Sequence, residues 1–148
     1  MESSTKSPAF TMRILKYAMV VSAFLFIYVA VTVPVQPGPP AAQPFEIVIT
    51  LVALASVAGG FVIPRIFFQA RNSTPQESPT QAQLQRWFSR GVLSLACFEA
   101  CILFGLVLHF VHARVWLVEF LFGLGIVAEL VWSPGAPPVA GAGEFPTN

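Results

Sequence analysis

Four long apolar segments constrain what this chain can fold into. Each carries few charges, and short polar or proline-rich connections separate them. A bilayer core is about 30 Å thick and needs about 20 helical residues to cross it. The pattern therefore predicts an all-α polytopic membrane protein whose transmembrane domain covers residues 14–132. We expect its four spans at about residues 14–33, 45–68, 87–110 and 113–132.

The connections predict how the helices pair. A tight turn around "HFVHAR" separates the third segment from the fourth, and the Pro-rich "PVQPGPPAAQP" joins the first two. Short connections favour antiparallel neighbours, so we expect two antiparallel hairpins packed as a four-helix bundle. Pro64 should kink or end the second helix near its far end. The Pro/Gly/Ala composition of residues 133–148 predicts a flexible tail.

The basic start of the chain also resembles a cleaved signal peptide. However, the first apolar stretch is longer than a usual signal core, and "TVPVQPGPP" is a poor small-residue cleavage site. We therefore expect a retained span that follows a cytoplasmic segment at residues 1–13.

Basic residues predict the orientation. Lys and Arg favour the cytoplasmic side of a membrane. Only Arg114 lies in the tight turn, and the Pro-rich connection has no basic residue. We expect both termini and the middle connection inside, in a plasma or bacterial inner membrane, which agrees with an even number of spans. The other seven of the eight basic residues lie on this inner side: Lys6, Arg13, Lys16, Arg65, Arg71, Arg86 and Arg90.

Composition argues against several classes of function. Only 10% of the residues are charged, against about one quarter in an average soluble domain. The net charge of +1 gives no indication of nucleic-acid binding. The chain contains no Asp, no phosphate-binding Gly-rich loop, no HExxH and no zinc-type Cys/His spacing. We expect no enzymatic activity, no catalytic residues, no metal site and no nucleic-acid partner.

Three glutamates fall inside the predicted spans. Insertion scales assign a cost of about 2.5–3.5 kcal/mol to such a charge at the centre of a span, so these groups are usually protonated, paired or directed at a cavity. Glu99 lies near the midplane, where desolvation favours its protonated form, and it is either a polar contact between subunits or a proton-titrating group. Glu119 lies toward the outer end of its helix, where we expect a buried hydrogen bond. Glu129 lies near the inner end, where Arg90 is its predicted ion-pair partner.

Small residues predict where helices approach each other closely. They occur at helical spacing in the second and third segments, and the two cysteines, four apart on one helix, are not expected to form a disulfide. Glu99 projects away from the stripe on the third helix, toward another part of the chain, a second subunit, a cofactor or lipid. The predicted packing residues are Ser56, Gly59, Gly60, Cys97, Cys101 and Gly105.

His109 and His112 end the third segment. A neutral imidazole can bind the metal of haem or chlorophyll, and Gly105 one turn before His109 would leave room for a flat ring. The ordinary interpretation is a pair of polar residues where the helix meets water. We predict no cofactor, and haem or chlorophyll remains an alternative.

These observations predict three functions, in this order. The first is a non-catalytic accessory or structural subunit, held in the lipid bilayer by other membrane subunits in a hetero-complex or a homo-oligomer. The second is a proton-relay or small-solute transport protein that uses Glu99 and Glu119. The third is a haem- or chlorophyll-binding subunit that uses His109.

Overall fold

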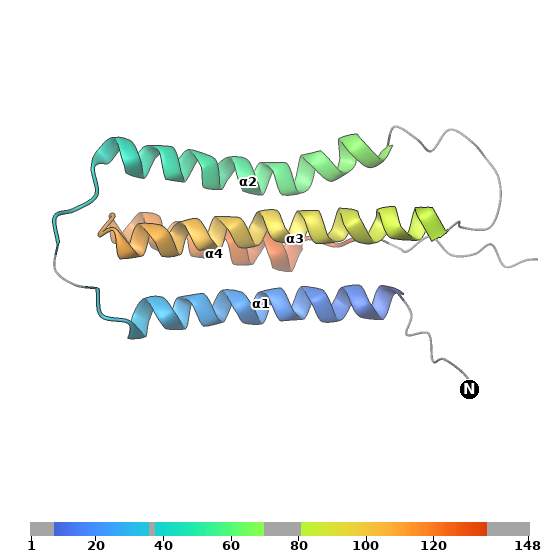
Figure 1. The fold of residues 1–148 in the computed structure, drawn as a ribbon, viewed down its shortest axis with the longest axis horizontal. Helices are drawn as coiled ribbons and strands as arrows, with labels where there is room; N and C mark the ends of the chain where they lie inside the picture. The colour runs from blue at the N-terminus through green and yellow to red at the C-terminus, as the bar shows by residue number, and fades with distance from the viewer. Residues whose placement is uncertain (1–7, 36–37, 70–80, 136–148) are drawn as a thin grey trace, which may run out of the picture.

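The computed structural model describes residues 8–35, 38–69 and 81–135. In these parts of the chain, the predicted all-α fold with four helices is confirmed, and the helices pack as a bundle (Figure 1). Most of the predicted tail, half of the N-terminal segment and the middle connection at residues 70–80 lie outside the described residues. The helices are α1 (Pro8–Thr32), α2 (Gln43–Gln69), α3 (Gln81–Phe110) and α4 (Val115–Val131).

Helix α3 is the centre of the bundle. Helices α2 and α4 pack along it, and α1 packs against both α3 and α4. Helices α1 and α2 lie on opposite sides of α3, and no backbone contact joins them (Figure 1). The first predicted hairpin therefore differs from a packed pair: residues 33–42 carry the chain across α3, because α3 offers each neighbour a separate face.

Successive helices run in opposite directions (Figure 1). The start of α1, the end of α2, the start of α3 and the end of α4 lie together, and we call this the terminal end. The connection at residues 33–42 and the turn at residues 111–114 lie at the opposite end, which we call the turn end. The side of the membrane that each end faces is a separate question, to which the basic residues speak.

Pro64 lies inside α2, which continues to Gln69. Proline has no backbone N–H, so the carbonyl of Gly60 loses its usual donor four residues later. The hydroxyl of Ser94, on α3, donates a hydrogen bond of 2.8 Å to that carbonyl. This bond from a neighbouring helix supplies the missing donor, so Pro64 does not end the helix.

The turn between α3 and α4 is closed by backbone hydrogen bonds. The N–H of Ala113 donates to the carbonyl of Leu108 at 3.0 Å, and the N–H of His112 donates to that of His109 at 3.2 Å. His112 has a φ of 58°, in the left-handed region that commonly ends a helix. The predicted tight turn between these two helices is present, and it sets α4 antiparallel to α3.

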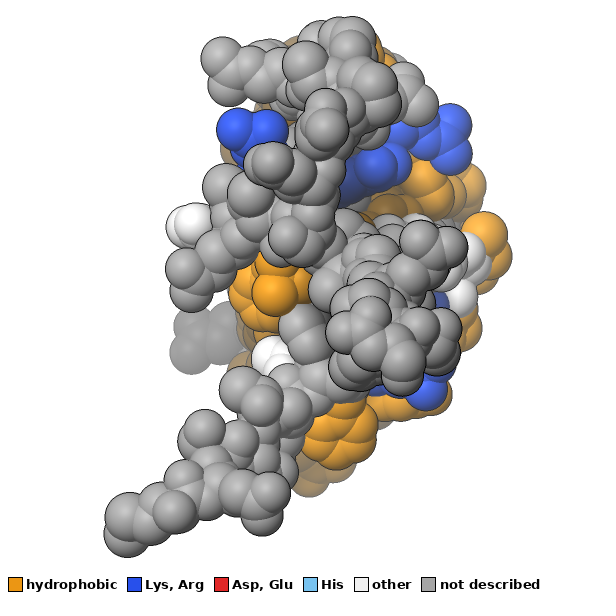
Figure 2. Space-filling view, turned by 90° about the vertical axis from the view of Figure 1, so that its right-hand side faces the viewer, with side chains coloured by type: hydrophobic (Ala, Val, Ile, Leu, Met, Phe, Trp, Pro, Cys, Tyr) orange, Lys and Arg blue, Asp and Glu red, His pale blue; other side chains and the backbone are white. Residues whose placement is uncertain are grey.

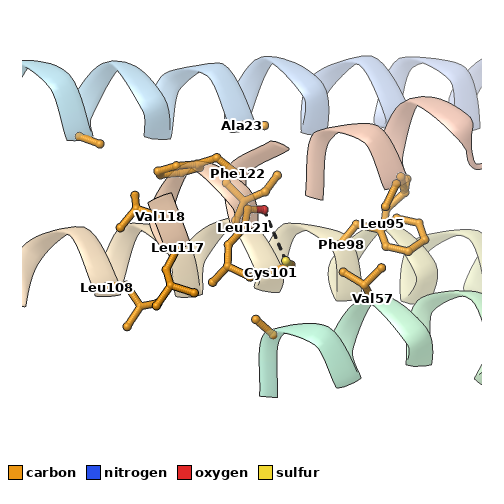
Figure 3. Close-up of a cluster of buried hydrophobic side chains, with 14 of the residues drawn as sticks. Ala23, Val57, Leu95, Phe98, Cys101, Leu108, Leu117, Val118, Leu121 and Phe122 are labelled. Carbon is orange, nitrogen blue, oxygen red and sulfur yellow. Dashed lines mark hydrogen bonds between the residues drawn. The ribbon is translucent and has the colours of Figure 1, made fainter. Parts of the chain in front are cut away.

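The buried core lies around α3. Phe98 is fully buried, and its ring lies 4.9 Å from that of Phe61 and 6.4 Å from that of Trp132, measured between centroids. Figure 3 shows Ala23 of α1 and Val57 of α2 on opposite sides of the α3–α4 layer. The core therefore joins all four helices through the side chains of α3.

Three of the helices are long and apolar enough to cross a membrane. Their candidate spans are Ala9–Thr32, Gln43–Ile66 and Gln83–Phe110. Helix α4 has 17 residues and is shorter than the other three. Three membrane-crossing helices are thus supported by length and composition.

Candidate functional site: a buried carboxyl pair

Glu99 of α3 and Glu129 of α4 lie with their carboxyl groups in direct contact. Their exposed fractions are 9% and 0%. The register explains the meeting: Gly91 faces Trp132 and Gly105 faces Leu121, which places Glu129 about one turn nearer the terminal end than Glu99. Helical side chains lean toward the N-terminus of their own helix. In antiparallel helices the two carboxyl groups therefore lean toward each other.

Ser22 brings a third helix to the pair. Its hydroxyl donates a hydrogen bond of 2.6 Å to Oε1 of Glu99. Ser22 lies on α1, so Glu99 faces another part of this chain, which is one of the alternatives left open by its position on the helix. The pair is therefore enclosed by α1, α3 and α4.

The remaining carboxyl oxygens indicate a shared proton. Oε2 of Glu99 and both oxygens of Glu129 are buried and have no hydrogen-bond donor among the described residues. An ionised carboxylate only accepts hydrogen bonds, whereas a protonated carboxyl also donates one. A single proton held between the two groups gives them a hydrogen bond and removes the repulsion between two adjacent charges. This arrangement can bind and release a proton.

Lys16 is the cation near the pair. Its Nζ donates to the carbonyls of Leu130 at 3.0 Å and Trp132 at 2.6 Å, at the end of α4. A cation at the C-terminus of a helix satisfies its free carbonyls and its dipole. The charge of Lys16 also acts on Glu129. Lys16 therefore links α1 to the end of α4 beside the carboxyl pair.

Arg90 lies elsewhere than against its predicted partner. Among the described residues it forms no ion pair with Glu129; it lines a cleft with Arg65 of α2. The reason is the direction that each residue faces on its helix. Arg90 lies on the α2 side of α3, whereas Glu129 turns toward α1.

A cleft opens at the terminal end beside Lys16. It has a volume of about 550 Å³, and Arg13, Tyr17 and Trp87 also line it. Lys16 thus faces the cleft and also lies near Glu129. The described residues therefore place polar groups in sequence from this cleft to the interior of the bundle.

Glu119 lies apart from the pair. Its side chain is exposed, and it makes no hydrogen bond or ion pair with the described residues. It precedes Glu129 by ten residues, which at 100° per residue turns it about 80° around α4. The structure therefore brings Glu99 together with Glu129, and leaves Glu119 on the outside of the bundle.

A second buried carboxyl, which the sequence interpretation missed, lies at the turn end. Glu46 is 5% exposed, and its Oε1 accepts a hydrogen bond of 3.1 Å from the backbone N–H of Arg114. Its Oε2 lies 3.5 Å from Nε of Arg114. The signal was available, because Arg114 is the only basic residue predicted at that end and Glu46 begins the apolar part of α2.

The two histidines lie beside the turn between α3 and α4. Nε2 of His109 and Nε2 of His112 are buried and have no hydrogen-bond partner among the described residues. No group of three or more His, Cys, Asp or Glu side chains that could hold a metal ion occurs in the described part of the chain. The assignment of His109 as a ligand of haem or chlorophyll stays a prediction.

The small residues of α3 divide between two neighbours. A Cβ added to Gly60 of α2 would lie 3.1 Å from Cβ of Cys97. Cys101 points the other way, where its thiol donates to the carbonyl of Leu121 in α4 at 3.5 Å (Figure 3). Gly105 also faces α4, 3.3 Å from Cβ of Leu121 by the same measure. One stripe on the sequence thus serves two helix contacts.

Other glycine and serine positions differ in their role. Ser56 donates to the carbonyl of Val52 in its own helix, and a Cβ on Gly59 would meet only Ile63 of α2. Neither residue lies at a helix contact. Gly91 and Gly125, which the sequence interpretation did not single out, allow close approach of Met12 and Ile102 respectively.

No family model, curated protein or solved structure matches the chain. The candidate site is therefore defined by its geometry: two carboxyl groups in contact, one serine donor from a third helix and one lysine beside them.

Proposed function

We propose that this chain is a small integral membrane protein that binds and releases a proton at the Glu99–Glu129 pair and so acts as a proton-relay element. The observation that carries the proposal is the contact between these two buried carboxyl groups. Buried ionisable groups in membrane helices commonly mark proton pathways. This proposal replaces Glu119, the second residue of the predicted relay, with Glu129, because Glu119 is exposed on the outside of α4.

The exposed surface of the helices supports insertion into a bilayer. Only 11% and 17% of the most apolar windows of α1 and α2 are buried within the bundle, against 50% for α3. Exposed side chains in these helices are large and apolar, such as Leu51 at 60% and Ile66 at 63%. Contiguous apolar surface of this kind suits lipid. Helix α4 spans roughly 26 Å, at the short end of what crosses a bilayer core, so we propose four spans.

Basic residues support the orientation with both termini in the cytoplasm. In the described residues, Lys16, Arg65, Arg86 and Arg90 lie toward the terminal end, and Arg114 lies at the turn end beside Glu46. Lys and Arg favour the cytoplasmic side. The cleft beside Lys16 would then open toward the cytoplasm, and a proton would reach Glu129 from that side before it passes to Glu99.

Infrared spectroscopy tests the shared proton. The expected result for the full-length protein in detergent is a protonated-carboxyl stretch at neutral pH, which disappears or shifts in both Glu99→Gln and Glu129→Gln. Glu119→Gln is the matched control, because it removes an exposed glutamate from the same helix as Glu129, and it should leave the band unchanged. A wild-type spectrum without this band would contradict the proposal.

Proton flux into liposomes tests the relay. Reconstituted wild-type protein should relax an imposed pH difference faster than empty liposomes, and Glu99→Gln and Glu129→Gln should each reduce the rate to that of empty liposomes. Glu119→Gln should retain the wild-type rate. Equal rates in the wild type and in both pair variants would show that the pair is structural.

Labelling with a membrane-impermeant thiol reagent tests the four spans. A cysteine placed at Gly38 should react from outside intact cells, whereas one placed at Arg71 should react only after the cells are opened. Cys101 is buried and Cys97 is half-buried, so the background should be low. Reaction at Arg71→Cys in intact cells would overturn the orientation.

A second function, as a non-catalytic accessory subunit, is supported by a stripe on α1. Five large side chains lie at alternating spacings of four and three residues, and their exposed fractions run from 57% to 81%. Such a 3.5-residue period is typical of a helix that packs against another helix. The stripe consists of Tyr17, Val21, Phe24, Tyr28 and Val31.

Native gel analysis of mildly solubilised source membranes tests this function. The protein should migrate in a larger complex, and Tyr17→Ala with Val21→Ala should release it. Replacement of Leu51 and Ile66, which are exposed on α2, controls for a general loss of apolar surface. Migration of the wild type only as a monomer would contradict the accessory function and leave the proton-relay proposal standing.

A further inference from the structure

We propose that a cleft between Arg65 of α2 and Arg90 of α3 binds the phosphate group of an anionic lipid headgroup. The cleft has a volume of about 310 Å³. We call it the two-arginine cleft; Phe61, Ser94, Trp132 and Ser133 also line it. The proposal rests on the membrane placement given under the proposed function, and it does not depend on the carboxyl pair.

The charges in the two-arginine cleft are unopposed. None of the described residues that line it is acidic, and neither Arg65 nor Arg90 forms an ion pair with a described carboxylate. Figure 2 shows the terminal end of the molecule, where Lys and Arg side chains emerge between hydrophobic ones. The guanidinium group presents a planar fork of donors that matches a phosphate. Two such groups on adjacent helices form a site for one phosphate.

The two arginines lie at the depth of lipid phosphates. Arg65 lies 22 residues after the start of α2 at Gln43, and Arg90 lies 20 residues before the end of α3 at Phe110. At 1.5 Å per residue these distances are roughly 30–33 Å, about the thickness of the hydrocarbon core. If the turn end lies at one surface of the core, both guanidinium groups lie at the other.

The apolar walls favour a lipid over free phosphate. The aromatic side chains of Phe61 and Trp132 lie beside the arginines, and Val131, at 72% exposed, also lines the cleft. The upper part of a lipid tail can contact these side chains while its headgroup meets the arginines. Inorganic phosphate would gain nothing from this surface.

Lipid binding to the intact protein tests the inference. Purified full-length protein in detergent is titrated with phosphatidylglycerol or with phosphatidylcholine, and bound lipid is counted by native mass spectrometry. The wild type should retain phosphatidylglycerol in preference to phosphatidylcholine. The double variant Arg65→Gln, Arg90→Gln should bind it at least about tenfold more weakly, because charge-assisted hydrogen bonds are lost. Arg86→Gln is the matched control, because it removes a charge from the same end outside the cleft.

Further arms separate the alternatives. An equal loss in Arg86→Gln would show a general charge effect and overturn the site, and displacement of the lipid by an equal concentration of inorganic phosphate would overturn the lipid assignment. Circular dichroism checks that the double variant folds. If it does not fold, Arg65→Lys with Arg90→Lys decides: it keeps the charges but loses the forks, so binding should still weaken, and wild-type binding would overturn the assignment.

Carbonate extraction of membranes separates this inference from the proposed function. If the wild-type protein appears in the soluble fraction, the membrane placement fails and the lipid site fails with it. If the protein stays in the membrane fraction but shows no preference for the anionic lipid, the lipid site alone fails.

Discussion

The carboxyl group of Glu99 touches that of Glu129, thirty residues further along the chain, in the closed interior between α1, α3 and α4. Because α3 and α4 are antiparallel, each side chain leans toward the other. Two groups that repel when both are charged can lie together only if one of them is neutral or a cation compensates, and Lys16 lies on the α4 side of the pair.

The first prediction concerns the dependence of stability on pH. The folded protein holds one proton between Glu99 and Glu129, and unfolding exposes both carboxyls and releases it near neutral pH. Stability is therefore lost as the pH rises, by at most about 1.4 kcal/mol per pH unit for one proton. Glu129→Gln leaves a single carboxyl, so its slope should be flatter. Unfolding in mixed detergent micelles at neutral and alkaline pH measures both slopes, and identical slopes would refute the shared proton.

The second prediction concerns the serine donor. Ser22→Ala removes the hydrogen bond to Oε1 of Glu99 and leaves that oxygen buried without a donor. We expect a loss of about 0.6–2 kcal/mol in the free energy of unfolding, as for other hydrogen bonds between membrane helices and buried unpaired groups. Ser56→Ala is the control, because its hydroxyl bonds only to a carbonyl of its own helix. The inference fails if both variants lose the same amount.

The third prediction concerns the approach of α2 to α3. A Cβ on Gly60 would lie 2.6 Å from Cε1 of Phe98, so Gly60→Ala forces a shift in the core. We expect a destabilisation of about 1–3 kcal/mol. Gly123→Ala adds a methyl group where nothing lies within 4 Å and should be neutral or slightly stabilising. The measurement is the unfolding midpoint of both variants in the same micelles.

The fourth prediction concerns the contact at the turn end. Glu46→Ala leaves the backbone N–H of Arg114 without its acceptor, and we expect a loss of about 1–2 kcal/mol. Glu46→Gln keeps an oxygen acceptor and should lose less. The side chain of Arg114 is 56% exposed, so its ion pair contributes little. High salt should therefore change wild-type stability only slightly, and a large salt effect would assign the contribution to the ion pair instead.

The sequence by itself determined the helices. Long apolar runs separated by proline-rich or polar connections can form only helices in lipid, where each backbone group needs an internal partner. This local rule is why four helices were predicted close to their observed positions. It also located Glu99 and Glu129 as candidate residues, because a charged side chain within an apolar run is visible without any structure.

Only the tertiary structure decided which residues meet. The contact between Glu99 and Glu129 depends on the α3–α4 register and on the rotation of each helix, and both are set by packing around Gly105, Gly125 and Cys101. Helical spacing alone grouped Glu119 with Glu129, although only Glu129 turns inward. Packing also put α1 and α2 on opposite sides of α3, because the two faces of α3 carry different small residues. Periodicity reports the face of a single helix, whereas a site between helices depends on how several faces fit together.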